Sequence, residues 1–324
     1  MRRLLVLVAL LFSLPAQAVT IDWVAVGNPN NLADTPSTNC VAAANCGSVD
    51  HAYYISKYEV TNAQYAEFLN AKAASDPLGL YNPLMDSDAT FGGITRSGVS
   101  GSYSYTAKAG FENQPVSWVS FYDALRFSNW LNNGQGSGDT ETGAYTITAG
   151  GIAANSITRN PGAITFLPSE NEWYKAVYYS AGGVYFENPT GTDSVIGCVA
   201  PGSDTGNSAN CGFAVGALTN VGAYGLSDSP YGTYDQGGNV IEWNEEIVSG
   251  SYRVIRGGSW GSNASSLAAS DPKFGSPSGD GSGLGFRVAS LVPEPGPGLL
   301  GMTAVLSLAA SRRRRANQSS PAPT

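Results

Sequence analysis

Apolar residues recur at the spacing of an α-helix in three stretches of the chain, all in its N-terminal part. In residues 60–74, VTNAQYAEFLNAKAA, Tyr65 and Phe68 fall on one face. Thr61 precedes this face and Gln64 follows three residues later. This is the spacing of a capping box, in which two side chains satisfy the free N–H groups at a helix start. The pattern predicts a helix that begins at Thr61.

Two further stretches follow the same logic. Residues 119–133, VSFYDALRFSNWLNN, predict a helix that starts near Ser120 and stops at the Asn-Gly pair that follows it. Residues 167–183, LPSENEWYKAVYYSAGG, have Ser169 as N-cap and Glu172 three residues on. This third helix is predicted to run to the glycine pair that closes the stretch.

The remaining positions show no helical period. Residues 86–112 and 133–163 are rich in Gly, Ser and Thr, which predicts hairpins and long loops. From residue 184 onward we expect short strands and loops, which need disulfides, metal ions or buried tryptophans to hold them. With 42% hydrophobic and 13% charged residues the chain is able to form a core. The pattern therefore predicts a loop-rich α+β protein and excludes a disordered one.

Both ends depart from this pattern. Residues 1–18 combine two arginines, an apolar run and a small-residue end, which predicts a secretory signal peptide cleaved after Ala18. In residues 292–316 the tripeptide Pro-Glu-Pro precedes a short apolar stretch and four arginines, and a polar tail, 317–324, follows. The apolar stretch is too short to span a bilayer comfortably.

The segment 292–316 resembles the PEP-CTERM sorting signal of Gram-negative bacteria. That resemblance implies recognition by an exosortase and the secretion machinery, followed by processing near Pro-Glu-Pro. It also implies delivery to the cell envelope, cell surface or extracellular matrix, with membrane contact only through this segment. A plain tail anchor is the alternative.

Removing the two ends changes the charge of the chain. The formal net charge is −8, but the ends hold six of the 17 basic residues and one of the 25 acidic ones. The 11 basic and 24 acidic residues left give the exported part a charge of about −13. Such a surface disfavours nucleic acid as a partner and suits solubility or cation binding.

Four cysteines in an exported chain predict two disulfides. Cys40 with Cys46, and Cys198 with Cys211, are the local pairings. Three connectivities are possible in all, and the sequence does not choose between them.

Six motifs in order resemble the formylglycine-generating enzyme, or sulfatase-modifying factor, family. They are YYISKYEVTNAQYAEFL (53–69), QPVSWVSFYDALRFSNWL (114–131), ITFLPSENEWYKA (164–176), YDQGGNVIEWNEE (234–246), RVIRGGSW (253–260) and GLGFRVAS (283–290). The resemblance implies one compact domain over residues 19–291, related to the C-type lectin fold, with little regular secondary structure and bound calcium.

The family oxidises a cysteine of a sulfatase to formylglycine with oxygen and a copper ion held by two cysteines. Thiolates are the soft ligands that Cu(I) prefers. In the family these cysteines stand two and seven residues after the aromatic of the Gly-Gly-Ser-aromatic motif. The matching positions here are Ser262 and Leu267. We therefore expect no bound copper and no catalytic residue of this kind.

The resemblance places a calcium site in DQGGNVIEW. Its ligands would be the Asp235 side chain, the carbonyls of Gly238 and Val240, and the Glu242 carboxylate. Oxygen atoms of this kind are the ligands that calcium takes. A second family site begins at an Asn-x pair, which Asn210 matches, but the sequence does not place its later ligands.

Other ionisable residues carry weaker signals. His51 is the only histidine, so iron or zinc sites built from several histidines are excluded, and we expect an ordinary surface or strand-edge role for it. Glu245 and Glu246 are adjacent and point to opposite faces of a strand. Glu170 and Glu172 stand in the first turn of a predicted helix, where the helix dipole accounts for them. We expect structural roles for these carboxylates.

Arg256 and Arg287 lie in the IRGGSW and GFR motifs. Arginine beside glycine and aromatic residues either packs flat and bonds carbonyls or contacts an acidic ligand. The sequence as a whole predicts an exported, calcium-stabilised binding or structural module of the envelope or extracellular polysaccharide. The alternative is a diverged enzyme, either an oxidase or one with other chemistry at Arg256 and Arg287.

Overall fold

The computed structural model describes residues 18–35 and 46–291. The chain divides into two compact units after Ser290, and the described residues up to that point belong to the first. Within the described residues, no helix is both long enough and apolar enough to cross a membrane. The predicted signal peptide, sorting signal and polar tail lie outside the described residues (1–17, 292–316 and 317–324).

The three predicted helices are present, and each begins with a capping box. They are α1 (Asn62–Lys72), α3 (Phe121–Asn132) and α5 (Glu170–Tyr178). In α1 the Thr61 hydroxyl accepts from the Gln64 N–H, and the Gln64 side chain accepts from the Thr61 N–H. The prediction of these helix starts from capping residues is confirmed.

The third helix ends earlier than predicted, at Tyr178 rather than near residue 183. Tyr179 adopts extended backbone angles and forms an antiparallel bridge with Tyr185. The Phe186 N–H donates to the Tyr178 carbonyl at 2.8 Å. The chain thus turns back on itself before the glycines, so these glycines belong to the turn.

Short helices interrupt the regions expected to be loops. They are α2 (Leu84–Ser87), α4 (Ala149–Ala153) and the 3-10 turns η2 (Pro201–Ser203) and η3 (Ala264–Leu267). Each is about one turn long, too short to give a hydrophobic period. In α4 the Thr148 hydroxyl caps the helix by accepting from the Gly151 N–H.

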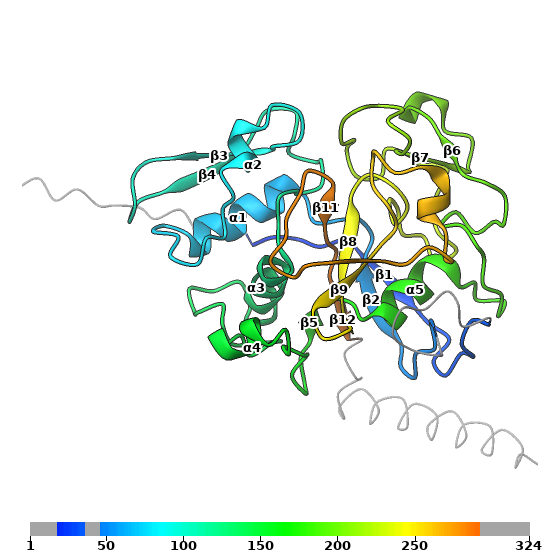
Figure 1. Ribbon diagram of the computed structural model, residues 1–324, viewed down its shortest axis with the longest axis horizontal. Coiled ribbons are helices and arrows are strands. Elements are labelled where there is room, and N and C mark those ends of the chain that lie inside the picture. Colours follow the sequence, from blue (N-terminus) through cyan, green and yellow to red (C-terminus); the bar gives the residue numbers. More distant parts are fainter. Residues whose placement is uncertain (1–17, 36–45, 292–324) are drawn as a thin grey trace, which may run out of the picture. The chain divides into compact units, whose positions relative to one another are not determined.

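One four-stranded sheet joins distant parts of the chain. Its order is β1 (Trp23–Val26), β2 (Tyr53–Ser56), β12 (Ala289–Leu291), β5 (Thr165–Phe166). β1 pairs antiparallel with β2, and β12 pairs antiparallel with β5. Figure 1 shows the blue N-terminal strands beside the C-terminal end of the described domain. This sheet closes the domain by bringing its two ends together.

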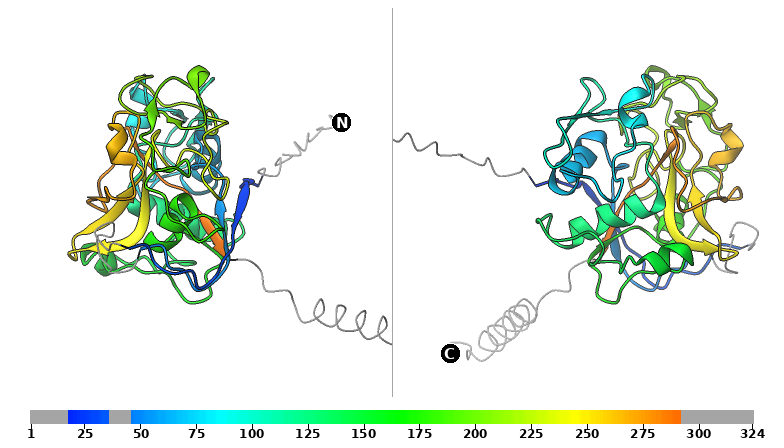
Figure 2. Two further views of the ribbon diagram at one scale, coloured as in Figure 1. Left: turned by 90° about the vertical axis from the view of Figure 1, so that its right-hand side faces the viewer. Right: turned by 60° about the vertical axis from the view of Figure 1, so that its left-hand side comes forward.

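A second sheet carries the motifs from the later part of the chain. Its order is β10 (Lys273–Gly275), β9 (Tyr252–Arg256), β8 (Ile241–Val248), β11 (Leu284–Gly285). β11 runs parallel to β8, and the other neighbours are antiparallel. Both views of Figure 2 place η3, in orange, near one end of the β8–β9 ribbon. The sheet therefore supports the segment that follows RVIRGGSW.

Two smaller pairs complete the described strands. The antiparallel hairpin of β3 (Ile94–Ser97) and β4 (Ser104–Ala107) lies beside α1 (Figure 1). The parallel pair is β6 (Gly197–Cys198) with β7 (Ser208–Ala209). The expectation of short strands and loops beyond residue 184 is confirmed for the described residues.

Aromatic rings fill the space between α1, α3 and the C-terminal strands. Tyr65 and Phe68 of α1 meet Phe127 and Trp130 of α3, with ring centroids 5.4 to 6.0 Å apart. Phe286 adds an edge contact to Phe127 at 5.4 Å. Such pairs contribute about 0.5–1.5 kcal/mol each beyond the area they bury.

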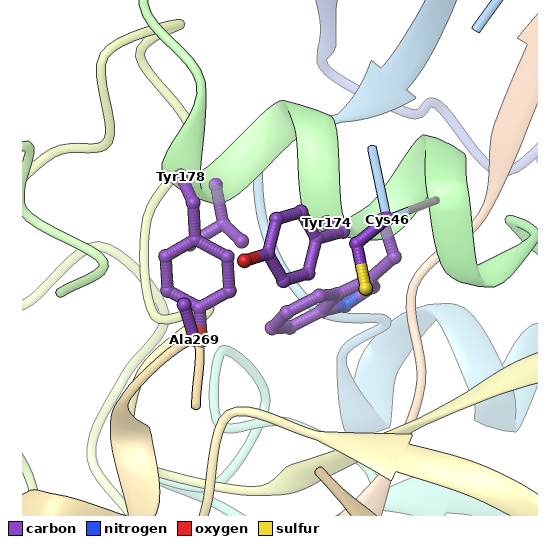
Figure 3. Packing of buried hydrophobic residues seen from close by; sticks show 6 residues of the cluster. Cys46, Tyr174, Tyr178 and Ala269 are labelled. Atoms are coloured by element: carbon purple, nitrogen blue, oxygen red, sulfur yellow. The ribbon is translucent and has the colours of Figure 1, made fainter. Parts of the chain in front are cut away.

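A second buried cluster surrounds α5. Tyr174 and Tyr178 of this helix pack together with Cys46 and Ala269, which come from opposite ends of the domain (Figure 3). The disulfide between Cys198 and Cys211 spans 13 residues, and Cys46 is disulfide-bonded as well. Cys40, its predicted partner, lies outside the described residues.

Candidate functional site

Arg256, at the end of β9, forms part of a buried ionic frame beneath the GGSW motif. Its Nε donates to Glu170 Oε1 at 2.9 Å, and its Nη1 donates to the Ala269 carbonyl at 2.8 Å. The next residue, Gly257, has φ +92°, and a Cβ there would lie 2.3 Å from the Gln236 carbonyl oxygen. Only glycine fits this close approach of two backbones. Arg256 thus ties β9 to α5.

Arg287 forms the second ion pair of the frame. Its Nε and Nη2 donate to the two carboxylate oxygens of Glu242, each at 2.7 Å, and both side chains are fully buried. The Trp173 indole N–H donates to the same carboxylate at 2.7 Å. Arg256 and Arg287 are both fully buried in these ion pairs, and both also donate to backbone carbonyls, which is the packing that the structural alternative describes.

A third ionic group lies at the start of α5. Arg159 makes paired hydrogen bonds to Glu172 and to Glu245, and Tyr145 also donates to Glu245. His51 Nε2 lies 3.1 Å from Glu172 Oε1. Burial alone would raise the pKa of Glu172, but bonds from His51 and Arg159 outweigh it and hold that pKa at about 2.

Sequence reasoning identified these carboxylates but missed their burial. Glu170 and Glu172 were assigned to the helix dipole, yet both are buried ion-pair partners. A glutamate in the first turn of a helix looks the same in sequence whether it faces solvent or a distant arginine. The positions of Arg159 and Arg256, 13 and 86 residues away from their partners, give no local signal.

Ser262 and Leu267 come together around Gly258. A Cβ on Gly258 would lie 2.9 Å from Leu267 Cδ1 and 3.2 Å from Ser262 Cβ. The Ser262 hydroxyl accepts from the Ser259 N–H at 3.0 Å. Leu267 is fully buried and packs against Cys211 of the disulfide. Ser262 thus presents a hydrogen-bonded hydroxyl, and Leu267 presents only a hydrocarbon side chain.

Three rings lie beside these positions, and we call Phe91, Phe213 and Trp260 the aromatic face. Trp260 stacks on Phe91 with centroids 4.4 Å apart and meets Phe213 edge-on at 5.2 Å. Phe213 is 67% exposed. Two backbone bonds fix its loop, from Gly212 N–H to the Ser262 carbonyl and from Phe213 N–H to the Trp260 carbonyl.

The loop expected to hold calcium contains buried carboxylates. Asp235 is half-buried, has φ +58° and accepts from the Gly222 N–H. In the described part of the chain, no backbone N–H donates to the carbonyl oxygens of Gly238 or Val240. Glu242 lies near Asp235 while it pairs with Arg287. Two carbonyls and one carboxylate oxygen thus retain free lone pairs.

Glu59, which the sequence did not single out, faces the same loop. It is buried and accepts from the Val240 N–H at 3.1 Å and from Asn239 Nδ2 at 2.9 Å. Burial, followed by the nearby charges of Asp235 and Glu242, raises the pKa of Glu59 well above its usual range. Burial likewise raises the pKa of Asp235 to about 6. Burial is the largest cause of both shifts, and the nearby positive charge of Arg287 lowers both pKa values in part.

Carboxylate and carbonyl oxygens, such as those of this loop, are the kinds of ligand that a hard divalent cation such as calcium takes. Such an ion would balance the excess negative charge of Asp235, Glu242 and Glu59 around Arg287. Within residues 18–35 and 46–291, Asp235, Glu242 and Glu59 included, no three His, Cys, Asp or Glu side chains gather as a metal site. The Asn210 amide oxygen is buried without a hydrogen-bond partner in the described residues.

Comparisons with known proteins show which sequences this chain is similar to. Residues 22–292 match the family model for the sulfatase-modifying factor enzyme 1-like domain. Two curated relatives, both named serine/threonine-protein kinase pkn1, come from Chlamydia caviae and Chlamydia pneumoniae and are 25% and 24% identical. Each alignment covers 74% of this chain and 33% of the relative, so the chain spans about a third of their length.

Solved structures of two proteins share the fold. CarF aligns with a TM-score of 0.56 and 21% identity over 85% of this chain and 100% of its own. Treponema denticola variable protein 1 aligns with a TM-score of 0.52 and 21% identity over 86% and 97%. The fold is the loop-rich α+β fold related to C-type lectin domains. Because the family model covers most of its length, the chain belongs to the sulfatase-modifying factor enzyme 1-like family.

Proposed function

We propose that the chain is an exported protein whose domain binds polysaccharide of the cell envelope or extracellular matrix without oxidising cysteine. The apolar run in residues 1–18 supports export. The segment 292–316, with its Pro-Glu-Pro, short apolar stretch and four arginines, supports sorting by an exosortase. Intact-mass analysis of protein from the native host should lack residues beyond about 295, whereas a retained arginine cluster would indicate a tail anchor.

The observation that carries the loss of oxidase chemistry is the pair Ser262 and Leu267. A neutral hydroxyl that accepts from the Ser259 N–H is a poor Cu(I) ligand, and the Leu267 hydrocarbon offers no donor atom. In the described residues every cysteine is held in a disulfide. The rigid floor built by Arg256 remains, so the domain keeps the scaffold of an oxidase site without its metal ligands.

In this proposal a bound calcium ion would have a structural role. Asp235, Glu242 and the carbonyls of Gly238 and Val240 would hold it, with Glu59 contributing charge nearby. When bound, the ion neutralises carboxylates and fixes the loop. The residues themselves already shape this loop through the bonds from Glu59 to Val240 and Asn239.

Retention on polysaccharide tests the binding role. Extracellular polysaccharide from the native host is immobilised, and the purified protein is passed over it with calcium present. We expect saturable retention that free polysaccharide competes away. If the protein passes through unretained, as an exported protein without a matching domain does, the binding function is wrong.

A further inference from the structure

We propose that the aromatic face of Phe91, Phe213 and Trp260 is the binding site for an uncharged glycan. This inference rests on the proposed function and names where the ligand binds and which class it belongs to. The face lies beside Ser262, so the surface that remains where metal ligands are missing becomes the recognition surface.

Phe213 has two features that disfavour the folded state, an exposed ring and a left-handed backbone conformation. Its ring is 67% exposed, and its backbone has φ +59°, a left-handed conformation that a bulky residue rarely adopts. Strained backbone and an exposed apolar ring both disfavour the folded state, and such violations concentrate at functional sites. Glycine would relieve the strain, so the phenylalanine ring itself is the feature that requires an explanation.

The ring is also held in a fixed position. The disulfide from Cys198 to Cys211 anchors the start of the loop, and Gly212 donates to Ser262 at 2.6 Å. The Phe213 N–H donates to the Trp260 carbonyl at 3.0 Å. Because the loop is already ordered, binding to this ring loses little conformational freedom.

Hydrogen-bonding groups surround the rings. In the described part of the chain, no acceptor is bonded to the Trp260 indole N–H, and this atom is not among the enclosed unpaired ones. The hydroxyl oxygens of Ser259 and Ser262, one on each side of Trp260 in the sequence, lie 3.4 Å apart. A sugar ring has an apolar C–H face and a rim of hydroxyls. Aromatic rings flanked by such donors and acceptors match both features.

The charge of the surface selects the kind of glycan. Residues 211–216 and 257–270 contain no Asp, Glu, Lys or Arg, and the charged group next to Phe91 is the Asp88 carboxylate, which accepts from the Phe91 N–H at 3.0 Å. The chain as a whole carries a formal charge of −8, so an anionic polymer would be repelled by the rest of the surface and gain no cationic partner here. An uncharged glycan would bind this face without electrostatic repulsion.

The test compares full-length variants for retention on immobilised neutral glucan, mannan and galactan, with alginate and an apolar peptide as other ligand classes. Phe213→Gly removes the ring and relieves its strain, so it should lower affinity for the retained neutral glycan about tenfold or more. Its melting temperature should not fall. Trp260→Phe keeps a ring but removes the indole N–H, and should lower affinity about threefold.

Phe274→Ala is the matched control. Phe274 is 53% exposed and packs on Tyr252, away from the aromatic face, so its removal should leave retention unchanged. If the wild type binds a neutral glycan and Phe213→Gly binds it equally well, this face is not the site although the proposed function stands. Preferential retention on alginate or on the peptide overturns the ligand class. Retention on none of them overturns the uncharged glycan as the ligand, while retention on the native host's polysaccharide decides the proposed function separately.

Discussion

The ionic frame and the aromatic face are neighbours in the chain but differ in chemistry. Arg256 ends one strand of the motif and is buried against Glu170, whereas Trp260, four residues later, lies partly exposed. The frame is charged, enclosed and hydrogen-bonded throughout. The face is neutral, partly exposed and includes the strained Phe213.

This contrast indicates in which of the two regions a substitution more readily unfolds the protein. Removing one member of a buried ion pair leaves an unpaired charge in a low-dielectric interior, which strongly destabilises the fold. Ser262 and Leu267 carry no charge, so a change at either position leaves no buried charge unpaired. These two positions are therefore easier to substitute than the arginines of the frame.

The largest expected effect comes from breaking the frame. Arg256→Met keeps the side-chain volume but leaves the Glu170 carboxylate without its cation, and should reduce the free energy of unfolding by about 3–5 kcal/mol. Urea denaturation measures this. Adding Glu170→Gln removes the unpaired charge while keeping a bond to Asn244, and should restore part of the loss. A loss below about 1 kcal/mol for Arg256→Met would contradict the frame's role.

Loss of the disulfide between Cys198 and Cys211 should reduce the free energy of unfolding somewhat less than Arg256→Met does. Replacing Cys198 and Cys211 together by alanine opens a loop of 13 residues and should destabilise the protein by about 3 kcal/mol. Because the loop also carries Phe213, glycan retention should weaken in the same variant. If the free energy of unfolding falls and glycan retention does not, the disulfide stabilises the fold but does not position the aromatic face.

Calcium should give an effect of similar or smaller size. At 100 times its dissociation constant, an ion that binds only the folded state stabilises it by about 2.7 kcal/mol. A chelator should therefore lower the melting temperature of the wild type. Asp235→Gly tolerates φ +58° and removes the carboxylate, so its melting temperature should respond little to calcium or chelator. An equal response in both proteins would contradict the calcium assignment.

The smallest effect concerns His51, which lies between Asp50 and Glu172, with the Tyr53 ring 5.9 Å away. The bond to Glu172 raises the His51 pKa, so the folded protein holds this proton more tightly than the unfolded chain. The resulting stability is full below about pH 6.5 and is lost as pH rises through the raised pKa.

Melting temperatures of wild type and His51→Gln across pH 5.5–9 test this shift. Because His51 is partly exposed, the wild type should lose only about 2 °C or less of its advantage with rising pH. Parallel curves for the two proteins would show that His51 contributes nothing that depends on its charge.

The sequence predicted local structure better than long-range pairing. Helix starts at Thr61 and Ser169 followed from capping residues because both partners lie within three positions, and the start near Ser120 followed from the apolar spacing. The end of α5 did not, because the bridge from Tyr179 to Tyr185 overrides the glycine signal.

In the candidate site, too, the sequence identified residues with fixed local spacing and missed residues that long-range contacts bring together. Ser262 and Leu267 were identified from a motif with fixed spacing, and the structure brings them together at Gly258. Glu59 was missed, since it lies 181 residues from Val240, to which it is bonded. The exposed Phe213 was also missed, because apolar residues in a loop look alike until their burial is known.

The most direct test of the central claim measures cysteine oxidation. The purified protein is incubated with copper, oxygen and a sulfatase-type cysteine peptide, and the peptide mass is followed against a control with free copper alone. Since Ser262 and Leu267 supply no thiolate, conversion to formylglycine should not exceed the control. Turnover above that control would contradict the claim that this domain retains the family's scaffold without its chemistry.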